Sequence, residues 1–99
     1  MKHFLIIITY IVPLDKIDEI LPQHRKFLQE GYDKNILLMS GPMNPRSAGV
    51  VIARAQSSDI IKDFFNFDPY KVNNYATYSF TEFDPVKHQE FLNSWVNGK

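Results

Sequence analysis

The sequence contains no cysteine, which excludes disulfide bonds, thiolate metal sites and a cysteine nucleophile. It also lacks any block of one charge: 11 Lys and Arg balance 11 Asp and Glu along the chain. We therefore expect no nucleic-acid or membrane partner, because no basic patch favours a phosphate backbone or an anionic membrane surface. The four glycines are dispersed and form no phosphate-binding loop, so we expect no nucleotide or other cofactor.

No apolar run is long enough to cross a bilayer. Residues 1–8 resemble the charged and apolar parts of a signal peptide, but no small-residue cleavage site follows them. We therefore expect a soluble, cytoplasmic protein. Ninety-nine residues supply one hydrophobic core and not two, so residues 1–99 are expected to form a single domain.

The strongest pattern is an apolar strand followed by an amphipathic helix. Residues 3–11 are apolar at nearly every position, which predicts a central strand with two apolar faces. The helix begins near Leu14, and His24 lies near the centre of its apolar stripe. Pro22 interrupts this helix, so we expect either a kink or a break with a new helix beside His24.

Three further strands are predicted. Residues 36–39 form a short apolar run, which the turn at residues 40–42 is expected to end. Residues 49–55 are expected to pair antiparallel with that run, and residues 75–83 alternate between a polar and an apolar side.

Two more helices are expected. Ser57 is a good N-cap for a helix that must end by Phe67, because Pro69 disfavours helical geometry at the preceding residue. Its predicted apolar stripe consists of Ile60, Ile61, Phe64 and Phe65. Asp84 is expected to open a last helix, so that residues 84–99 form a C-terminal helical extension with Phe91, Leu92 and Trp95 as its apolar contacts.

This order of elements predicts an α+β fold of the ferredoxin-like, split βαβ type, with both main helices on one face of the sheet. The other face would then remain apolar and uncovered. A second copy can cover it with the same face, so we expect a homodimer, with the C-terminal helix reaching across it.

His24 is the leading candidate for chemistry. A histidine on an apolar face is usually a packed residue with a satisfied hydrogen bond, so a functional role needs a partner. A carboxylate would orient the imidazole and stabilise its protonated form. Asp68 and Asp84 both precede a proline and suit N-caps, but Asp68 has only a short segment after it to cap.

Three segments together resemble the YCII-related (YciI-like) family over about residues 3–83. They are Leu21-Pro22-Gln23-His24, Leu37-Leu38-Met39-Ser40-Gly41-Pro42-Met43 and Asp68-Pro69-Tyr70. The resemblance implies a ferredoxin-like fold that forms a dimeric α/β barrel, with His24 and Asp68 as a proposed active-site pair. It also places the turn of Ser40, Gly41 and Pro42 beside the pocket. Many relatives carry a basic residue where this chain has Leu21, and Arg25 or Arg46 could replace it, although a solvated face or a loop contact is the simpler interpretation of each.

Other pocket candidates follow from position. Thr9, Tyr10 and Ser40 lie at strand ends, where they can line a pocket or serve as ordinary strand and turn residues, and Tyr70 belongs to the third segment. His3 and His88 form no metal-ligand spacing with His24, so no metal site is expected.

Three functions remain open. The first is a lyase or isomerase type of enzyme in which His24, oriented by Asp68, moves a proton on a small cyclic or hydroxyaromatic compound, as in the dehydrochlorinases and muconolactone isomerases to which the resemblance points. The second is a dimer that binds such a metabolite without turnover, because nothing in the sequence supplies an obvious electrophile. The third is a structural or accessory dimer whose histidine is only packed.

Overall fold

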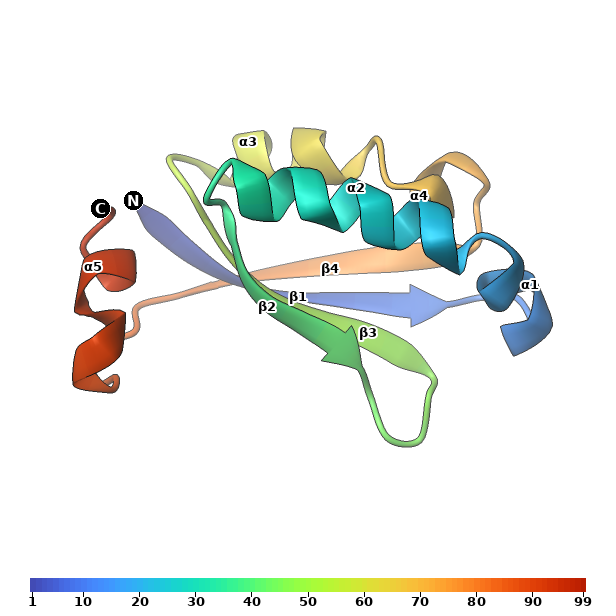
Figure 1. Cartoon of the computed structure of the whole chain (residues 1–99), viewed down its shortest axis with the longest axis horizontal. Helices are drawn as coiled ribbons and strands as arrows, with labels where there is room; N and C mark the ends of the chain where they lie inside the picture. Colours follow the sequence, from blue (N-terminus) through green and yellow to red (C-terminus); the bar gives the residue numbers. More distant parts are fainter.

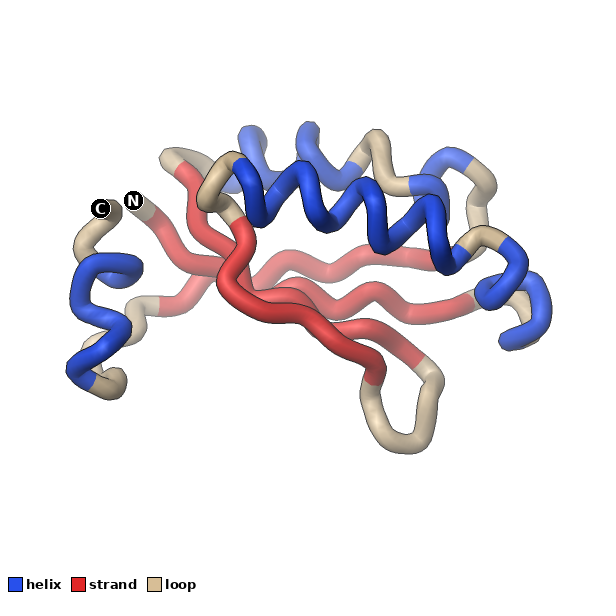
Figure 2. Tube along the Cα trace, in the orientation of Figure 1, coloured by secondary structure: helices blue, strands red, loops and turns tan.

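Strand β1 (Lys2–Tyr10) lies in the interior of the sheet, as its apolar character predicts. The structure is a computed structural model that describes residues 1–99. It places β1 between β3 (Ala48–Ala55) and β4 (Ala76–Phe83), and β1 pairs antiparallel with both. Strand β2 (Leu37–Pro42) pairs antiparallel with β3, so the sheet order is β2-β3-β1-β4 (Figure 2).

Two helices cover one face of this sheet. Figure 1 shows α2 (Leu21–Asp33) and α3 (Ser58–Phe65) side by side above the strands. The chain therefore forms an α+β fold with a four-stranded antiparallel sheet, compatible with the predicted ferredoxin-like arrangement. The apolar side chains between the two layers make one core, which includes Phe4, Ile6, Ile8, Phe27, Leu28, Val51, Ile61 and Phe65.

The predicted interruption at Pro22 is a break and not a kink. Helix α1 (Leu14–Glu19) ends before Ile20, and α2 begins at Leu21 with Pro22 in its first turn. Proline is tolerated there because the first backbone N–H groups of a helix have no partner within it. The backbone N–H of His24 donates to the Ile20 carbonyl at 3.0 Å, so His24 lies in the first turn of α2. Its buried side chain faces the sheet as the apolar stripe predicts.

Helix α3 begins as predicted but buries a narrower stripe. The Ser57 hydroxyl accepts a hydrogen bond from the Ile60 N–H at 3.2 Å, which confirms the N-cap. Ile61 and Phe65 are buried, whereas Ile60 is 50% exposed. The expectation for Ile60 was wrong because two helices share the sheet, and α3 has only a narrow contact with the core.

Strand β2 extends further than predicted and carries a bulge. Leu37 lies opposite Ala53, but Met39 lies opposite Ile52, so Leu38 is an extra residue in the ladder. Residues 40–42 do not end the strand, because they continue the pairing with β3. The bulge puts the side chains of Ser40 and Pro42 on the helix-covered face, opposite Val51 and Gly49.

The C-terminal segment differs most from its prediction. No helix begins at Asp84, and the helical turns are a 3₁₀ turn η1 (Glu90–Leu92) and a short α5 (Asn93–Val96). Phe91 is 83% exposed, so it is not an apolar contact. Residues 84–99 instead pack near β3 through Arg54, whose guanidinium stacks on the Trp95 ring and donates to the carbonyls of Trp95 and Lys99.

The second face of the sheet has no helical cover (Figure 1). Leu5 and Ile7 of β1 and Val50 and Ile52 of β3 point to this face and are only partly buried. It becomes more polar on β4, where Thr77, Ser79 and Thr81 lie beside β1. No helix of the chain is both long and apolar enough to span a bilayer.

Candidate functional site

Asp68 is the best-shielded polar residue of the site. It is fully buried and directly precedes the short helix α4 (Pro69–Val72). One carboxylate oxygen, Oδ1, accepts a hydrogen bond from the Tyr70 N–H at 3.1 Å. This is an N-cap, so the simpler interpretation of Asp68 from the sequence is correct. The cap occupies only one acceptor site of the carboxylate, so its two oxygens can accept hydrogen bonds from other donors as well.

His24 is the second partner of this carboxylate. Its Nδ1 atom lies 2.8 Å from Asp68 Oδ1, and the residue is only 8% exposed. An ionised carboxylate only accepts hydrogen bonds, so Nδ1 is the donor in this contact, and a neutral ring of that tautomer would carry its acceptor at Nε2. The contact joins the first turn of α2 to the start of α4, across 44 positions of sequence. The predicted pair is therefore in direct contact.

Tyr78 is a third partner of Asp68 and was not predicted. Its hydroxyl donates to Asp68 Oδ2 at 2.7 Å from the neighbouring strand β4. Burial, together with the Asp68 charge, raises the pKa of Tyr78 well above its ordinary value, so the phenol keeps its proton and remains a donor. The sequence held a signal for this contact, because Tyr78 falls on the apolar side of the alternation in β4. A buried tyrosine hydroxyl usually finds a partner.

Tyr70 packs against one face of the His24 imidazole. Its ring stacks on the His24 imidazole with 4.0 Å between centroids and 15° between planes. The ring is 1% exposed, and its hydroxyl makes no hydrogen bond within the chain. Burial raises the pKa of Tyr70 above its ordinary value, so this hydroxyl is neutral and can donate.

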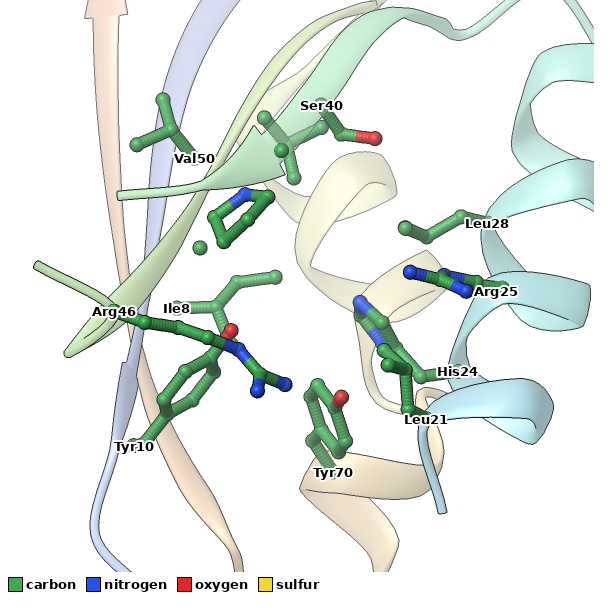
Figure 3. Close-up of a pocket in the computed structure, with 14 residues that line it drawn as sticks. Ile8, Tyr10, Leu21, His24, Arg25, Leu28, Ser40, Arg46, Val50 and Tyr70 are labelled. Atoms are coloured by element: carbon green, nitrogen blue, oxygen red, sulfur yellow. The ribbon is translucent and has the colours of Figure 1, made fainter. Parts of the chain in front are cut away.

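A cavity of about 340 Å³ opens beside this pair of rings (Figure 3). It lies between α2, the Ser40–Pro42 end of β2 and the facing part of β3. Figure 3 shows the His24 ring edge directed into the cavity. Because Nδ1 bonds Asp68, Nε2 is the ring nitrogen available to a bound molecule.

The structure brings most of the predicted pocket residues to this cavity. Those lining it are Tyr10, His24, Ser40, Gly41, Pro42 and Tyr70. Asp68 lies behind His24 and is not exposed to the cavity. The Ser40 hydroxyl is 2.7 Å from the Tyr32 hydroxyl, which ties β2 to α2.

Thr9 is a correction to the predicted pocket. Successive residues of a strand point to opposite faces. Ile8 and Tyr10 face the cavity, so Thr9 is exposed on the face without helices. Asp84 is likewise exposed and makes no contact with His24.

Two arginines, Arg25 and Arg46, line the cavity. The sequence favoured a solvated face or a loop contact for each of them. Arg25 follows His24 in α2, and Arg46 comes from the loop between β2 and β3. Arg46 also forms an ion pair of 2.6 Å with Asp18 of α1. Arg25 is exposed and Arg46 makes a loop contact, as expected, but both side chains also line the cavity. No group of three or more His, Asp or Glu side chains is arranged to hold a metal ion.

Comparison with known families agrees with this architecture. The YCII-related domain family model matches residues 1–84. The chain belongs to the YCII-related family. The match covers all four strands, both main helices and the His24–Asp68 pair of this YCII-related protein, and it ends at Asp84.

Among solved structures, the YCII-related chain is similar to 5-chloro-2-hydroxyhydroquinone dehydrochlorinase from Burkholderia phenoliruptrix in complex with 2,5-dihydroxybenzoquinone. The TM-score is 0.64 at 17% sequence identity, over 89% of this chain and 97% of the other. At this identity the similarity establishes a shared fold. No curated protein matches the sequence.

The site of this YCII-related protein is suited to acid–base chemistry. The buried carboxylate fixes the orientation of His24, and the stacked Tyr70 ring restricts its motion. A neutral imidazole held in this way accepts a proton at Nε2, and the resulting cation is stabilised by Asp68.

Proposed function

We propose that the protein is a lyase or isomerase type of enzyme in which His24 moves a proton on a small cyclic or hydroxyaromatic compound. The observation that carries the proposal is the 2.8 Å hydrogen bond between His24 Nδ1 and the fully buried Asp68, made at the wall of a cavity. His24 is the proposed base and Asp68 its positioning partner. The proposed substrate contacts are Tyr10, Ser40, Gly41, Pro42 and Tyr70.

A dehydrohalogenase-like elimination is one reaction that this pair can perform. His24 Nε2 takes a proton from the ring carbon or hydroxyl of the substrate, and the electrons of that bond form a new double bond. The carbon–halogen bond breaks, and the halide leaves with its electron pair, so the step needs no external oxidant or reductant. An isomerase would return the proton to another carbon from the same nitrogen. The dehydrochlorinase with the same fold supports this class of reaction.

Binding of a metabolite without turnover is the second candidate. The Tyr70 hydroxyl favours it, since this buried group has no partner in the chain and suits a polar atom of a ligand. A purely structural histidine is the weakest of the three interpretations, because a packed residue needs no cavity beside its ring.

We further propose a homodimer formed through the helix-free face of the sheet. Leu5, Ile7, Val50 and Ile52 give this face an apolar centre that a second copy would cover, as in a dimeric α/β barrel. The proposal takes residues 1–99 as one domain in the cytoplasm, with residues 84–99 as an extension of it.

Sedimentation should report twice the 11.6 kDa chain mass at micromolar concentration. Ile7→Glu should give a monomer, because it places a charge in the proposed contact. Ile60→Glu is the matched control, since Ile60 is 50% exposed on the helical side and should leave the dimer intact. A monomeric wild-type chain at micromolar concentration contradicts the proposed dimer.

A ligand screen tests the function itself. Hydroxybenzoates, hydroxyquinols and muconolactone-type lactones should be tested for a rise in the unfolding temperature, since a ligand at 100 times its Kd stabilises the native state by about 2.7 kcal/mol. Compounds that bind are then assayed for turnover, with chloride release measured for chlorinated hydroxyhydroquinones. We expect at least one hydroxyaromatic compound to bind and react. Binding without turnover supports the second candidate, and no binding across the screen contradicts both.

A further inference from the structure

The charged side chains that line the cavity are all cationic. Arg25 and Arg46 contribute guanidinium groups, and no Asp or Glu is on the wall. Figure 3 shows the two groups approaching from opposite sides, Arg25 beside His24 and Arg46 between Tyr10 and Tyr70. A concave site lined by charge of one sign attracts the opposite charge more strongly than an open surface does.

Arg25 has no partner within the chain. It is exposed, takes part in none of the ion pairs of the chain, and follows the proposed base directly in α2. The five N–H donors of a guanidinium match a carboxylate or another planar anion. Arg25 can therefore bind a ligand without breaking any contact of the protein.

Arg46 has a partner that a ligand can displace. Its ion pair with Asp18 is 2.6 Å long, and the two side chains are 31% and 52% exposed. Exposed ion pairs are weak because water screens both charges. The pair joins the β2–β3 loop to α1, so Asp18 competes with a bound anion for the same guanidinium.

The Tyr70 hydroxyl supplies a further donor. It is buried, has no partner in the chain, and points toward the cavity in Figure 3. The two guanidinium groups offer only hydrogen-bond donors to a bound molecule, and the neutral Tyr70 phenol can add one more. A carboxylate accepts hydrogen bonds from both guanidinium groups, whereas a neutral amide has one acceptor oxygen and adds N–H donors of its own.

We propose that the cavity selects an anionic ring compound, whose acidic group binds between Arg25 and Arg46 while Asp18 competes for Arg46. This rests on the proposed function, because the ring is taken to lie beside His24. It adds that the ligand carries a carboxylate or an ionised hydroxyl. Asp18 acts as an internal competitor that lowers the affinity for this anion.

Two isosteric probes separate charge from shape: 2,5-dihydroxybenzoate and 2,5-dihydroxybenzamide. Calorimetric titration of the folded wild-type protein should give at least about tenfold tighter binding of the acid. Arg25→Gln and Arg46→Gln should each weaken binding of the acid by about tenfold and barely change binding of the amide. Asp18→Asn should tighten binding of the acid by about twofold to fivefold. Lys26→Gln is the matched control, because it removes one exposed positive charge of α2 outside the cavity.

The outcomes separate this inference from the proposed enzyme. Equal affinity for acid and amide, or weakening by Lys26→Gln as large as that by Arg25→Gln, overturns the anion site even if a compound is turned over. Selection of the acid with no turnover of any compound supports the anion site and counts against the enzyme. Binding of neither probe overturns the anion site. Circular dichroism and the unfolding temperature establish that each variant is folded.

Discussion

Replacing His24 with asparagine is expected to lower turnover of a reacting compound by about 10²–10⁴-fold, the usual contribution of a general base. The asparagine amide can still donate to Asp68, so the buried carboxylate keeps a partner in place of the imidazole. What the variant loses is Nε2, the acceptor at the cavity wall. Ligand affinity should change by only a few fold, because the arginines and Tyr70 remain. Steady-state rates and titration of the same variant measure the two effects separately.

His88→Asn is the matched control for this experiment. His88 is exposed in the C-terminal segment, where its ring contacts Pro85 and Asn93 far from the cavity lining. Its replacement should leave the rate unchanged. A His24→Asn variant that reacts as fast as the wild type would remove His24 from the mechanism, and equal losses in both variants would indicate a general effect on the fold.

Asp68→Asn is expected to reduce both stability and activity. The carboxylate accepts from three donors, namely His24 Nδ1, the Tyr70 N–H and the Tyr78 hydroxyl. An amide has one acceptor oxygen and adds two N–H donors, so at least one of these buried contacts must be rearranged. An unsatisfied buried group costs about 1–3 kcal/mol. The unfolding temperature should fall by roughly 4–8 °C for each kcal/mol.

The same variant should also disturb the His24 tautomer. Without the carboxylate, the Nδ1–H form is no longer fixed, and nitrogen NMR of the imidazole reports which ring nitrogen carries the proton. We expect turnover to drop by about 10²-fold. Asp84→Asn is the control, because Asp84 is exposed and should change none of these quantities. Matching responses of the two variants would mean that Asp68 only caps α4.

The part of the site that the sequence predicted depends on local rules. His24 lies on an apolar stripe, and Asp68 precedes a proline at the start of a short helix, so burial of one and capping by the other follow from nearby residues. The fold followed from the order of elements in the same way. Ser57 marked a helix start correctly, and Pro22 marked an interruption that proved to be a break and not a kink, because capping and the missing proline N–H act within one turn.

What the sequence did not predict depends on contacts between distant segments. Tyr78 reaches Asp68 only because β4 lies beside α4 in the folded chain. Arg46 reaches the cavity from a loop whose direction is set by the pairing of β2 and β3. The C-terminal segment was misjudged for a related reason, since Arg54 attaches it through backbone carbonyls and these leave no trace in a hydrophobic pattern.

The bulge at Leu38 determines which side chains of β2 form the cavity wall. With a regular ladder from Leu37, Met39 and Gly41 would face the cavity, and Ser40 would turn to the other face of the sheet. Deletion of Leu38 would remove the bulge and leave Ser40 opposite Val51, whereas regular pairing through Leu38 would exchange this hydroxyl for the thioether of Met39 without any substitution. The register of β2 against β3 thus decides whether the cavity offers a ligand a hydroxyl or a thioether, with no change of residue type in the wall.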